Sequence, residues 1–454
     1  MAEDVGDNSA AIRAWVEETL RGTVTRIERQ PRWREAYYID VERDGSTDHY
    51  YFRASRDGDT DDLIIREGTL LNVLADHGIN VPRSYGFCPA VPGILIDGLR
   101  GTDMFHRAPP ADRAALAEQF VSELAKWHAI PIDAFAEAGL RVPEDPTRHH
   151  LMDLDELEAN FRSSIRSDTP AAPLLEFTLK WLRANCPTTA GPAVLVQGDT
   201  GPGQFLFEGA TLTGVIDWEM AKFGDPMYDL VCIRGRDLSY PVDDLASWLT
   251  RYSELSGRPL DQDLLRFHSV RTLIMTPVAI YPMIARGTLT GANAAIYQGW
   301  DTVYSRAMVQ CLAEAIGIEL PPVKLPQAQP TSRSWLFEAV SSGLIDELGP
   351  MQTDVMAHYR VGALNQIVGH LAIAEQVGAA CDEDVLDAAE ALLGVRPPDR
   401  ATADRMVQDA VLTAGPERDA DFVRYFWQDY ARREQLLGPL LGELAETATL
   451  SPMF

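Results

Sequence analysis

The sequence predicts an α+β fold in which two lobes are followed by an all-α C-terminal domain. Three observations carry this prediction. Strand-like runs dominate residues 23–97 and surround one helical segment at 61–77. Further along, the apolar spacing becomes helical, and a strand-turn-strand pattern at 193–217 interrupts it. A proline-rich segment at 321–330 then precedes a helical region at 334–449.

The predicted N-terminal lobe spans 1–98. Apolar residues at helical spacing predict an opening helix over 8–22 and a second helix over 61–77. Asp44-Gly45 supplies a turn between two of the strands. The strand-like runs lie at 24–27, 36–41, 49–53, 81–88 and 93–97.

The rest of the chain is predicted to be mainly helical. The second domain, 99–320, surrounds the strand-turn-strand pattern, and the prolines of 321–330 favour an extended linker. The domain at 331–454 has apolar residues at helical spacing and no glycine-rich loop or catalytic motif. We therefore expect it to be a packing or partner module, with a homodimer contact as one role.

The composition of the chain argues against two classes of binding partner, nucleic acids and membranes. The chain has 454 residues, with 40 Lys and Arg against 67 Asp and Glu, so its net charge is -27. This charge argues against nucleic-acid binding, which needs a basic surface, and mildly favours a cationic substrate. The most apolar run, 273–284, is too short to span a bilayer and contains two prolines. No membrane association is expected.

The cysteines and the N-terminus predict a cytoplasmic protein. Five cysteines are scattered along the chain without paired spacing, which is typical of reduced, buried thiols. The N-terminal residues Met1-Ala-Glu-Asp are acidic and have no apolar signal region.

The most informative segment runs from Val196 to Phe207 and is followed by Ile216-Asp-Trp-Glu219. It is predicted to place Asp199, Gln204 and Asp217 on two short strands joined by a glycine-containing turn. A turn aspartate is the plain interpretation of Asp199, because Asp-Thr-Gly-Pro is favourable turn chemistry. A second acid, Asp217, lies at the end of another apolar strand, and two such acids can converge on one cation. This pairing favours a functional role for Asp199 over a role in the turn alone.

These residue types predict phosphoryl transfer. The first carboxylate, Asp199, can accept a proton from a hydroxyl group. The amide of Gln204 and the carboxylate of Asp217 can hold Mg²⁺ against the phosphates of ATP.

Three motifs together resemble the aminoglycoside phosphotransferase family, whose members are relatives of protein kinases. They are Gln197-Gly-Asp-Thr-Gly-Pro-Gly-Gln204, Ile216-Asp-Trp-Glu219 and Gly224-Asp-Pro-Met-Tyr-Asp-Leu230. The resemblance covers roughly residues 20–310 and is nearest to the branch associated with acyl-CoA catabolism. The C-terminal module resembles a small helical protein that accompanies such kinases, here fused to the enzyme.

The resemblance implies a protein-kinase-like two-lobed fold and the cofactors ATP and Mg²⁺. It implies that Asp199 is the catalytic acid or base and that Gln204 and Asp217 are the metal ligands. Asp225 and Asp229 are expected to be structural. The family usually has His at position 197 and Asn at position 204. Glutamine keeps the amide oxygen at 204 but reaches roughly 1.5 Å further, and Mg²⁺ demands near-ideal octahedral geometry.

The resemblance also implies a nucleotide site in the N-terminal lobe. Arg53 stands where the kinase pattern has a phosphate-pairing lysine, and Glu67 stands where its partner glutamate would be. An ordinary surface ion pair is the alternative. The expected nucleotide-contacting residues are Arg32 and Arg34 in the loop over the phosphates, Arg53 and Glu67, and Ile96 and Asp97 in the hinge strand beside adenine.

Two histidine features are expected to be structural. His128 matches a helix-end pattern of the family. His149 and His150 have no third ligand nearby in the sequence, so a solvated loop is expected there and no metal site.

The resulting prediction is an ATP- and Mg²⁺-dependent kinase that phosphorylates an alcohol on a small molecule. Within the resembled branch, the expected acceptor is a hydroxyacyl-CoA or a hydroxy acid. Two alternatives stay open: an aminoglycoside or macrolide phosphotransferase, and a pseudokinase that binds nucleotide without turnover. Gln197, Gln204, Arg53 and the glycine-poor loop at 30–35 favour the pseudokinase weakly.

Overall fold

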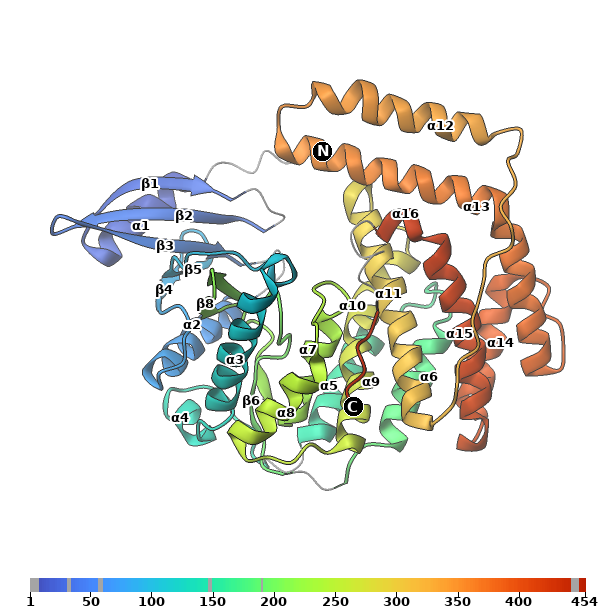
Figure 1. Ribbon diagram of the computed structural model, residues 1–454, viewed down its shortest axis with the longest axis horizontal. Coiled ribbons are helices and arrows are strands. Elements are labelled where there is room, and N and C mark those ends of the chain that lie inside the picture. Colours follow the sequence, from blue (N-terminus) through green and yellow to red (C-terminus); the bar gives the residue numbers. More distant parts are fainter. Residues whose placement is uncertain (1–7, 31–33, 56–59, 146–148, 189–190, 442–448) are drawn as a thin grey trace.

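The N-terminal lobe is a five-stranded antiparallel sheet with a helix on each face (Figure 1). The structure is a computed structural model and describes residues 8–30, 34–55, 60–145, 149–188, 191–441 and 449–454. The strands follow the order β1-β2-β3-β5-β4 across the sheet. The elements of this lobe are α1 (Ser9–Leu20), β1 (Thr23–Arg29), β2 (Ala36–Arg43), β3 (Ser46–Ala54), α2 (Asp61–Asp76), β4 (Ser84–Cys88) and β5 (Gly93–Asp97).

Local sequence explains this sheet well. Asp44 and Gly45 have φ angles of 53° and 80°, as a tight hairpin turn between β2 and β3 requires. Side chains alternate across the sheet, so neighbouring residues of β5 face different helices. Ile94 packs in the cluster that includes α2, whereas Leu95 packs in the cluster that includes α1.

The second lobe is helical and contains two separate two-stranded sheets. A single hairpin over 193–217 was expected, and this expectation is wrong. β6 pairs with β9, and β7 pairs with β8, both antiparallel. The elements are η1 (Phe105–Arg107), α3 (Pro110–Trp127), α4 (Ile132–Glu137), α5 (His149–Ser164), α6 (Pro173–Ala184), β6 (Val194–Val196), β7 (Phe205–Glu208), β8 (Thr211–Val215), β9 (Lys222–Gly224), α7 (Pro226–Arg236), α8 (Leu245–Ser256), α9 (Gln262–Leu273), α10 (Met275–Ala285) and α11 (Gly291–Ile316).

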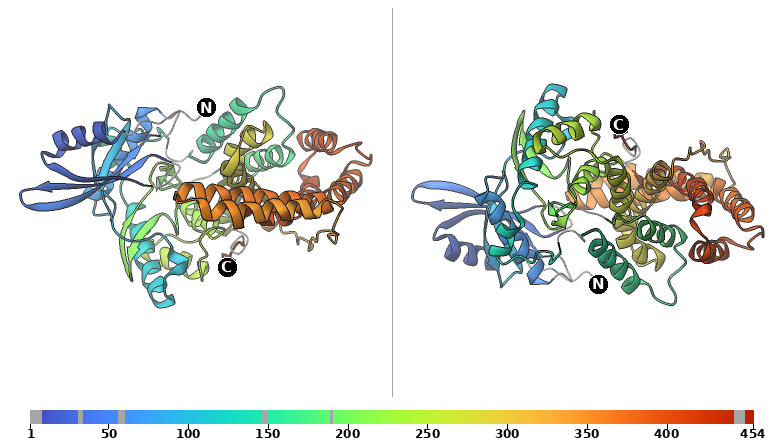
Figure 2. Two further views of the ribbon diagram at one scale, coloured as in Figure 1. Left: turned by 90° about the horizontal axis from the view of Figure 1, so that it is seen from above. Right: turned by 90° about the horizontal axis from the view of Figure 1, so that it is seen from below.

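The C-terminal region is all helical, as predicted. Its elements are α12 (Ser334–Ser342), η2 (Gly343–Leu348), η3 (Gly349–Met351), α13 (Val355–Leu393), α14 (Arg400–Thr413), η4 (Pro416–Arg418), α15 (Asp419–Leu436) and α16 (Gly438–Leu441). Figure 2 shows the sheet lobe at one end of the molecule and the C-terminal helices at the other. Throughout the described residues, every helix is too short or too polar to cross a membrane.

The C-terminal helices share a hydrophobic core with the second lobe. Phe177 of α6 lies 5.8 Å from Phe422 and 5.6 Å from Phe426 of α15, measured between ring centroids. The proline-rich linker runs extended beside α15 (Figure 1), where the Trp427 indole donates a hydrogen bond to the Pro321 carbonyl at 2.7 Å. The helices therefore pack as one body with the second lobe.

The last residues of the chain return to that lobe. Ser451 accepts a hydrogen bond from Arg234 Nε at 2.8 Å, and its backbone amide donates to Asp237 Oδ2 at 2.8 Å. Met453 is 6% exposed and belongs to a core cluster that includes residues of α7 and α9. By contrast, Phe454 is 54% exposed. The end of the chain therefore fills a space in the core that helices α7 and α9 border.

We predict that Met453→Ala lowers the free energy of unfolding by about 2 kcal/mol, because a large buried side chain is removed and a cavity remains. Phe454→Ala is the matched control, and we expect a change below about 0.5 kcal/mol for this exposed residue. Urea denaturation of both variants measures the difference. Equal stability of the two variants would show that the C-terminal end does not contribute to the core.

Candidate active site

A buried carboxylate, Asp229 of α7, holds the loop that carries Asp199. The backbone amides of Gln197 and Gly198 donate to it at 2.9 and 3.0 Å. His128 Nε2 lies 3.1 Å from the same carboxylate, so this histidine has the structural position that the sequence predicted. Burial raises the pKa of Asp229, but the contact with His128 and the hydrogen bond from the Gly198 amide help to outweigh burial, and the pKa lies below its usual value.

The same loop needs glycine at two positions where it packs closely against later segments of the protein. Gly198 has a φ of 89°, and a Cβ there would collide with the carbonyl oxygen of Met220. Gly203 has a φ of 87°, and a Cβ there would meet the Arg236 guanidinium. This close packing fixes the path of the loop on both sides of Asp199, whose side chain is one of those that line a cavity of the second lobe.

The register of the β7–β8 hairpin brings Gln204 and Asp217 together. Phe205 pairs with Val215, and the Ile216 amide donates to the Gln204 carbonyl at 2.9 Å. Gln204 therefore lies just before β7, and Asp217 lies just after β8. Asp217 has a φ of 61°, which is unusual for a residue other than glycine and turns the chain sharply after β8.

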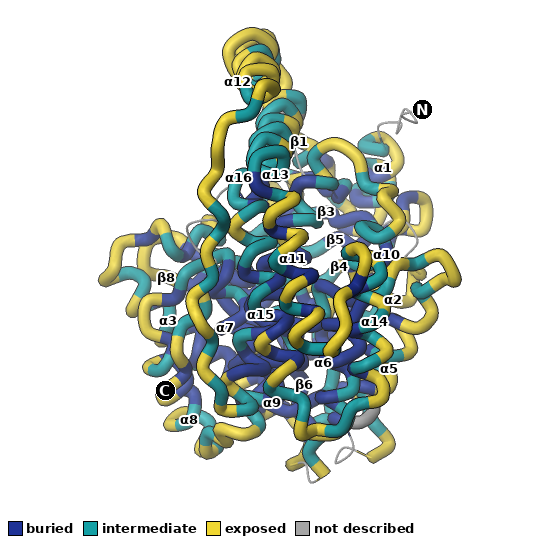
Figure 3. The backbone as a smooth tube through the Cα atoms, turned by 90° about the vertical axis from the view of Figure 1, so that its right-hand side faces the viewer, coloured by how far each residue is buried: buried dark blue, intermediate teal, exposed yellow. Residues whose placement is uncertain are grey.

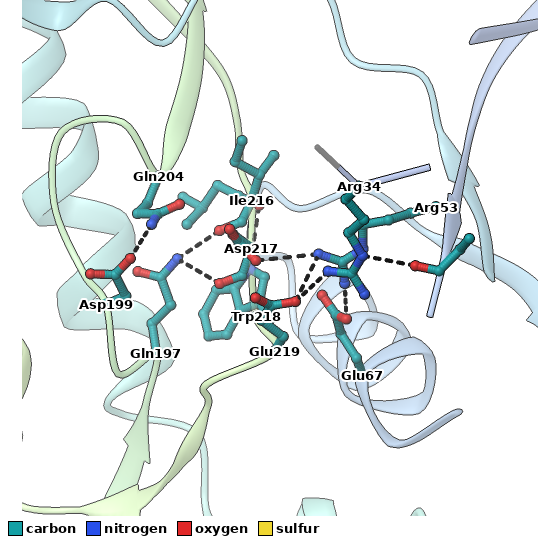
Figure 4. A network of polar contacts seen from close by, with 12 residues as sticks. Arg34, Arg53, Glu67, Gln197, Asp199, Gln204, Ile216, Asp217, Trp218 and Glu219 are labelled. Atoms are coloured by element: carbon teal, nitrogen blue, oxygen red, sulfur yellow. Dashed lines mark hydrogen bonds and ion pairs between the residues drawn. The ribbon is translucent and has the colours of Figure 1, made fainter. Parts of the chain in front are cut away.

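Asp199 is linked to Gln204 by a hydrogen bond from the Gln204 amide group. Because this bond uses the amide nitrogen, the amide oxygen of Gln204 is turned away from Asp199 (Figure 4). An amide oxygen and the Asp217 carboxylate at one end of a hairpin are the hard oxygen donors that Mg²⁺ prefers. The donor chemistry of this site thus fits the predicted ion.

Gln197 supports the segment that carries Asp217. Its side-chain amide donates to the Ile216 carbonyl at 2.6 Å. The residue is fully buried. This contact agrees with the expectation that position 197 organises the backbone.

A second group of charges links the two lobes. Arg53 of β3 forms an ion pair with Glu67 of α2, and its guanidinium also lies 3.2 Å from Asp217 and 3.5 Å from Glu219. Arg34 binds Glu219 at 2.5 Å and donates to the Ala54 carbonyl at 2.8 Å (Figure 4).

The Arg53–Glu67 pair is not a surface ion pair. Arg53 is 8% exposed and Glu67 is 5% exposed. Burial lowers the pKa of Arg53 to about 10, against the charge of Asp217. The guanidinium therefore stays charged at neutral pH and lies at the lobe interface.

The other expected nucleotide-contacting residues differ in their placement. Arg32 lies outside the described residues. Ile96 and Asp97 lie on β5, but the Asp97 carboxylate accepts hydrogen bonds from the Arg83 amide at 2.8 Å and the Tyr85 hydroxyl at 2.7 Å. The side chain of Asp97 is thus bound within its own lobe. The backbone of β5 is paired with β3 on one side and β4 on the other, and the Asp97 amide donates to the Arg83 carbonyl at 3.0 Å.

A family model for the phosphotransferase enzyme family matches residues 32–268, which is more than half of the chain. The chain belongs to this family. The family that the sequence predicted is thereby confirmed, and membership agrees with the predicted use of ATP and Mg²⁺. The acyl-CoA-associated branch stays a prediction.

The fold of this phosphotransferase is supported by a solved structure with a TM-score above 0.5. A candidate aminoglycoside phosphotransferase from Ralstonia eutropha JMP134 is 18% identical, with a TM-score of 0.53, over 67% of this chain and 97% of that chain. A macrolide 2′-phosphotransferase from Brachybacterium faecium is 22% identical, with a TM-score of 0.45, over 63% and 97% of the two chains. None of the curated proteins matches the chain. The predicted two-lobed, kinase-like fold is confirmed.

Beside Asp199 the phosphotransferase has a cavity of about 500 Å³. Its wall combines apolar and aromatic side chains with polar ones. The lining residues include Met220, Tyr240, Met275, Trp300, Tyr304 and Leu441, and also His106, Ser239, Thr272 and Thr276. Leu441 belongs to α16, so the C-terminal region contributes to this wall. Among the described lining residues, Asp199 is the only carboxylate and Arg236 is the only Arg or Lys.

Arg236 is the residue of this site that the sequence analysis missed. Its guanidinium lies 3.2 Å from Asp199 Oδ2 and donates through Nε to the Pro202 carbonyl at 3.0 Å. Burial raises the pKa of Asp199, and Arg236 opposes that effect. Arg236 follows Asp229 by seven residues on α7, which places both on one helix face. This spacing is the signal that would have identified it.

Proposed function

We propose that this phosphotransferase moves the γ-phosphoryl group of ATP onto an alcohol of a small molecule. The observation that carries the proposal is the position of Asp199. Its carboxylate lines the cavity, accepts a hydrogen bond from the Gln204 amide group, and lies near enough to Asp217 for that negative charge to raise its pKa. A base, an acceptor pocket and a metal-ligand pair therefore meet at one point, as phosphoryl transfer requires.

In this proposal Asp199 is the base. The acceptor hydroxyl hydrogen-bonds to Asp199, and its proton moves to that carboxylate as the hydroxyl oxygen bonds to the γ-phosphorus. The bond from this phosphorus to the bridging oxygen breaks, and ADP leaves. The pKa of Asp199, raised by burial, makes the carboxylate a stronger base than an exposed aspartate.

Asp217 and Gln204 would hold Mg²⁺, which supplies positive charge against the phosphates when it is bound. Arg53 lies 3.2 Å from Asp217, so phosphate oxygens at the ion would be within reach of its guanidinium. The buried pair with Glu67 holds Arg53 in that position. Arg34, bound to Glu219 beside it, adds a second positive charge at the lobe interface.

We predict that Asp199→Asn reduces kcat by about 10²–10⁴, because an amide cannot accept the proton. Binding of Mg·ATP, measured by calorimetry, should stay within a few-fold of the parent. Asp263→Asn is the matched control, since the Asp263 side chain is 96% exposed, and it should leave kcat unchanged. If Asp199→Asn keeps kcat within a few-fold, Asp199 is not the base. If the parent binds Mg·ATP and transfers phosphate to no acceptor, the pseudokinase alternative replaces the proposal.

The chemistry of the cavity supports a hydroxy acid or a hydroxyacyl compound, including a CoA-linked one, as the acceptor. An aminoglycoside is a polycation, and a complementary pocket would offer several carboxylates. Here Arg236 neutralises Asp199, and apolar and aromatic side chains make up much of the remaining wall. The acidic net charge of the whole chain favours a cationic substrate. The described cavity lining, however, has no excess of acidic side chains, because it contains one carboxylate and one arginine.

We predict that a panel assay by ³²P transfer finds the highest kcat/KM among hydroxy acids and hydroxyacyl thioesters. Trp300→Ala should raise the KM for that acceptor by about tenfold, because an aromatic contact worth about 1.4 kcal/mol is lost. Trp335→Ala is the matched control, since Trp335 is 62% exposed and lies outside the cavity. Higher kcat/KM for an aminoglycoside or a macrolide would overturn this assignment in favour of the antibiotic-kinase alternative.

The exposed apolar side of α12 supports the predicted homodimer. No residue of α12 is buried, and Trp335, Leu336 and Val340 are 62%, 45% and 52% exposed. Figure 3 shows this helix standing out from the body of the molecule beside α13. Exposed apolar surface of this extent is typical of an interface, and two copies can cover the same face on each other.

We predict a mass of about twice 50.2 kDa by light scattering in solution. Leu336→Glu with Val340→Glu should halve that mass, because two charges would be placed in the contact. Leu255→Glu is the control, since Leu255 is 39% exposed on α8, far along the chain from this surface. A monomeric parent protein would refute the dimer.

The five cysteines are free thiols. This observation supports the predicted cytoplasmic location, because a reducing compartment keeps thiols unpaired. Cell fractionation of the tagged full chain tests it, and recovery in a secreted fraction would contradict it.

A further inference from the structure

A cluster of buried histidines and one carboxylate lies away from Asp199. His149 and His150 begin α5, and Asp225 lies just before α7. One potential ligand atom from each of the three lies within 4.8 Å of the other two. The residues are 3%, 4% and 5% exposed. The sequence analysis expected a solvated loop here, because Asp225 is distant in the sequence and the fold alone brings it to the histidines.

Several polar atoms in this cluster have no hydrogen-bond partner among the described residues. They are Nε2 of His150 and both ring nitrogens of His268, a residue of α9 that is 3% exposed. The rings of His150 and His268 lie 5.1 Å apart between centroids. An unpaired buried polar group costs about 1–3 kcal/mol, so three such atoms together indicate a ligand that satisfies them.

The other contacts of His149, His150 and Asp225 leave one potential metal-ligating atom available on each residue. Asp225 Oδ1 accepts a hydrogen bond from the Met227 amide at 2.8 Å, and its other oxygen lies 3.7 Å from His150 Nε2. His149 Nε2 lies 3.3 Å from the Gly191 carbonyl. When this nitrogen donates, Nδ1 carries the lone pair. A backbone carbonyl that orients the second ring nitrogen is typical of histidines that bind metal.

The charges around the cluster are compatible with a cation. Burial lowers the pKa of His150 to about 4 and also lowers those of His149 and His268, so neutral imidazoles face the cluster at pH 7. Asp153, the other nearby acid, is bound to Lys222 and Arg271 and is not available as a ligand.

We propose that His149, His150 and Asp225 bind one zinc ion. Two imidazoles and one carboxylate are a common donor set for zinc, and small movements of the side chains would bring the three atoms to about 2.0–2.2 Å from the ion. The fourth position of the tetrahedron is filled by water, and His268 accepts a hydrogen bond from that water. This assignment gives a partner to Nε2 of His150 and to one of the two ring nitrogens of His268.

The ion would have a structural role next to the catalytic loop. It would join the start of α5 to the start of α7, and α7 carries both Asp229 and Arg236. Asp229 holds the backbone of the loop, and Arg236 contacts Asp199. The site is separate from Asp217 and Gln204, so it does not depend on the proposed function.

The first test measures the metal in the full-length protein. Protein expressed with added zinc and then desalted should contain close to one zinc per chain by mass spectrometry, and chelation should lower its Tm. Cobalt added to the apoprotein should produce the visible absorption bands of a tetrahedral site. Absence of zinc together with absence of these bands would overturn the proposal.

Variants then locate the ion. His150→Leu should reduce bound zinc at least tenfold and abolish the cobalt bands, whereas His358→Leu, at an exposed histidine, should change neither. Asp217→Asn should keep the bands, which excludes the predicted magnesium site as their source. If His150→Leu retains zinc and the bands, the assignment is wrong. If that variant does not fold, His149→Asn in the same assays provides the equivalent comparison.

Discussion

The active site depends on the buried carboxylate of Asp229. This carboxylate accepts hydrogen bonds from the backbone amides of Gln197 and Gly198. His128 and Trp127, at the end of α3, also form hydrogen bonds with it. A buried charge is costly unless it is hydrogen-bonded on all sides, so the loop, α3 and α7 are constrained to meet at this point. The position of Asp199 follows from that junction.

A second set of charges couples the lobes to the same loop. Arg53 joins the sheet to α2 through Glu67, and it reaches the β8 end through Asp217. Asp217 is both a neighbour of Arg53 and a proposed metal ligand, so the contact between the lobes and the proposed metal position share one carboxylate. Gln204, at the start of the β7–β8 hairpin that leads to Asp217, donates a hydrogen bond to Asp199. Its longer side chain thus connects the proposed base with the proposed metal position.

The C-terminal helices take part in the catalytic body instead of forming an independent attachment. They complete the core around α6 and α11, and Leu441 reaches the wall of the cavity beside Asp199. The chain end inserts Met453 beneath α7, the helix that carries Asp229. The region without catalytic motifs therefore lines the cavity beside Asp199 and supports α7, which holds the loop. The exposed side of α12 is left for contact with another chain.

The sequence by itself determined the elements whose causes are local. Apolar periodicity predicted the helices, Asp44-Gly45 predicted a hairpin turn, and the order of the three motifs identified the family. The tertiary structure decided which strands pair, because β6 meets β9 across the intervening hairpin and no local signal encodes that partner. It also decided that Arg236 contacts Asp199 and that Asp225 lies beside His149 and His150. These contacts join residues far apart in the chain, and long-range packing of buried charges creates them.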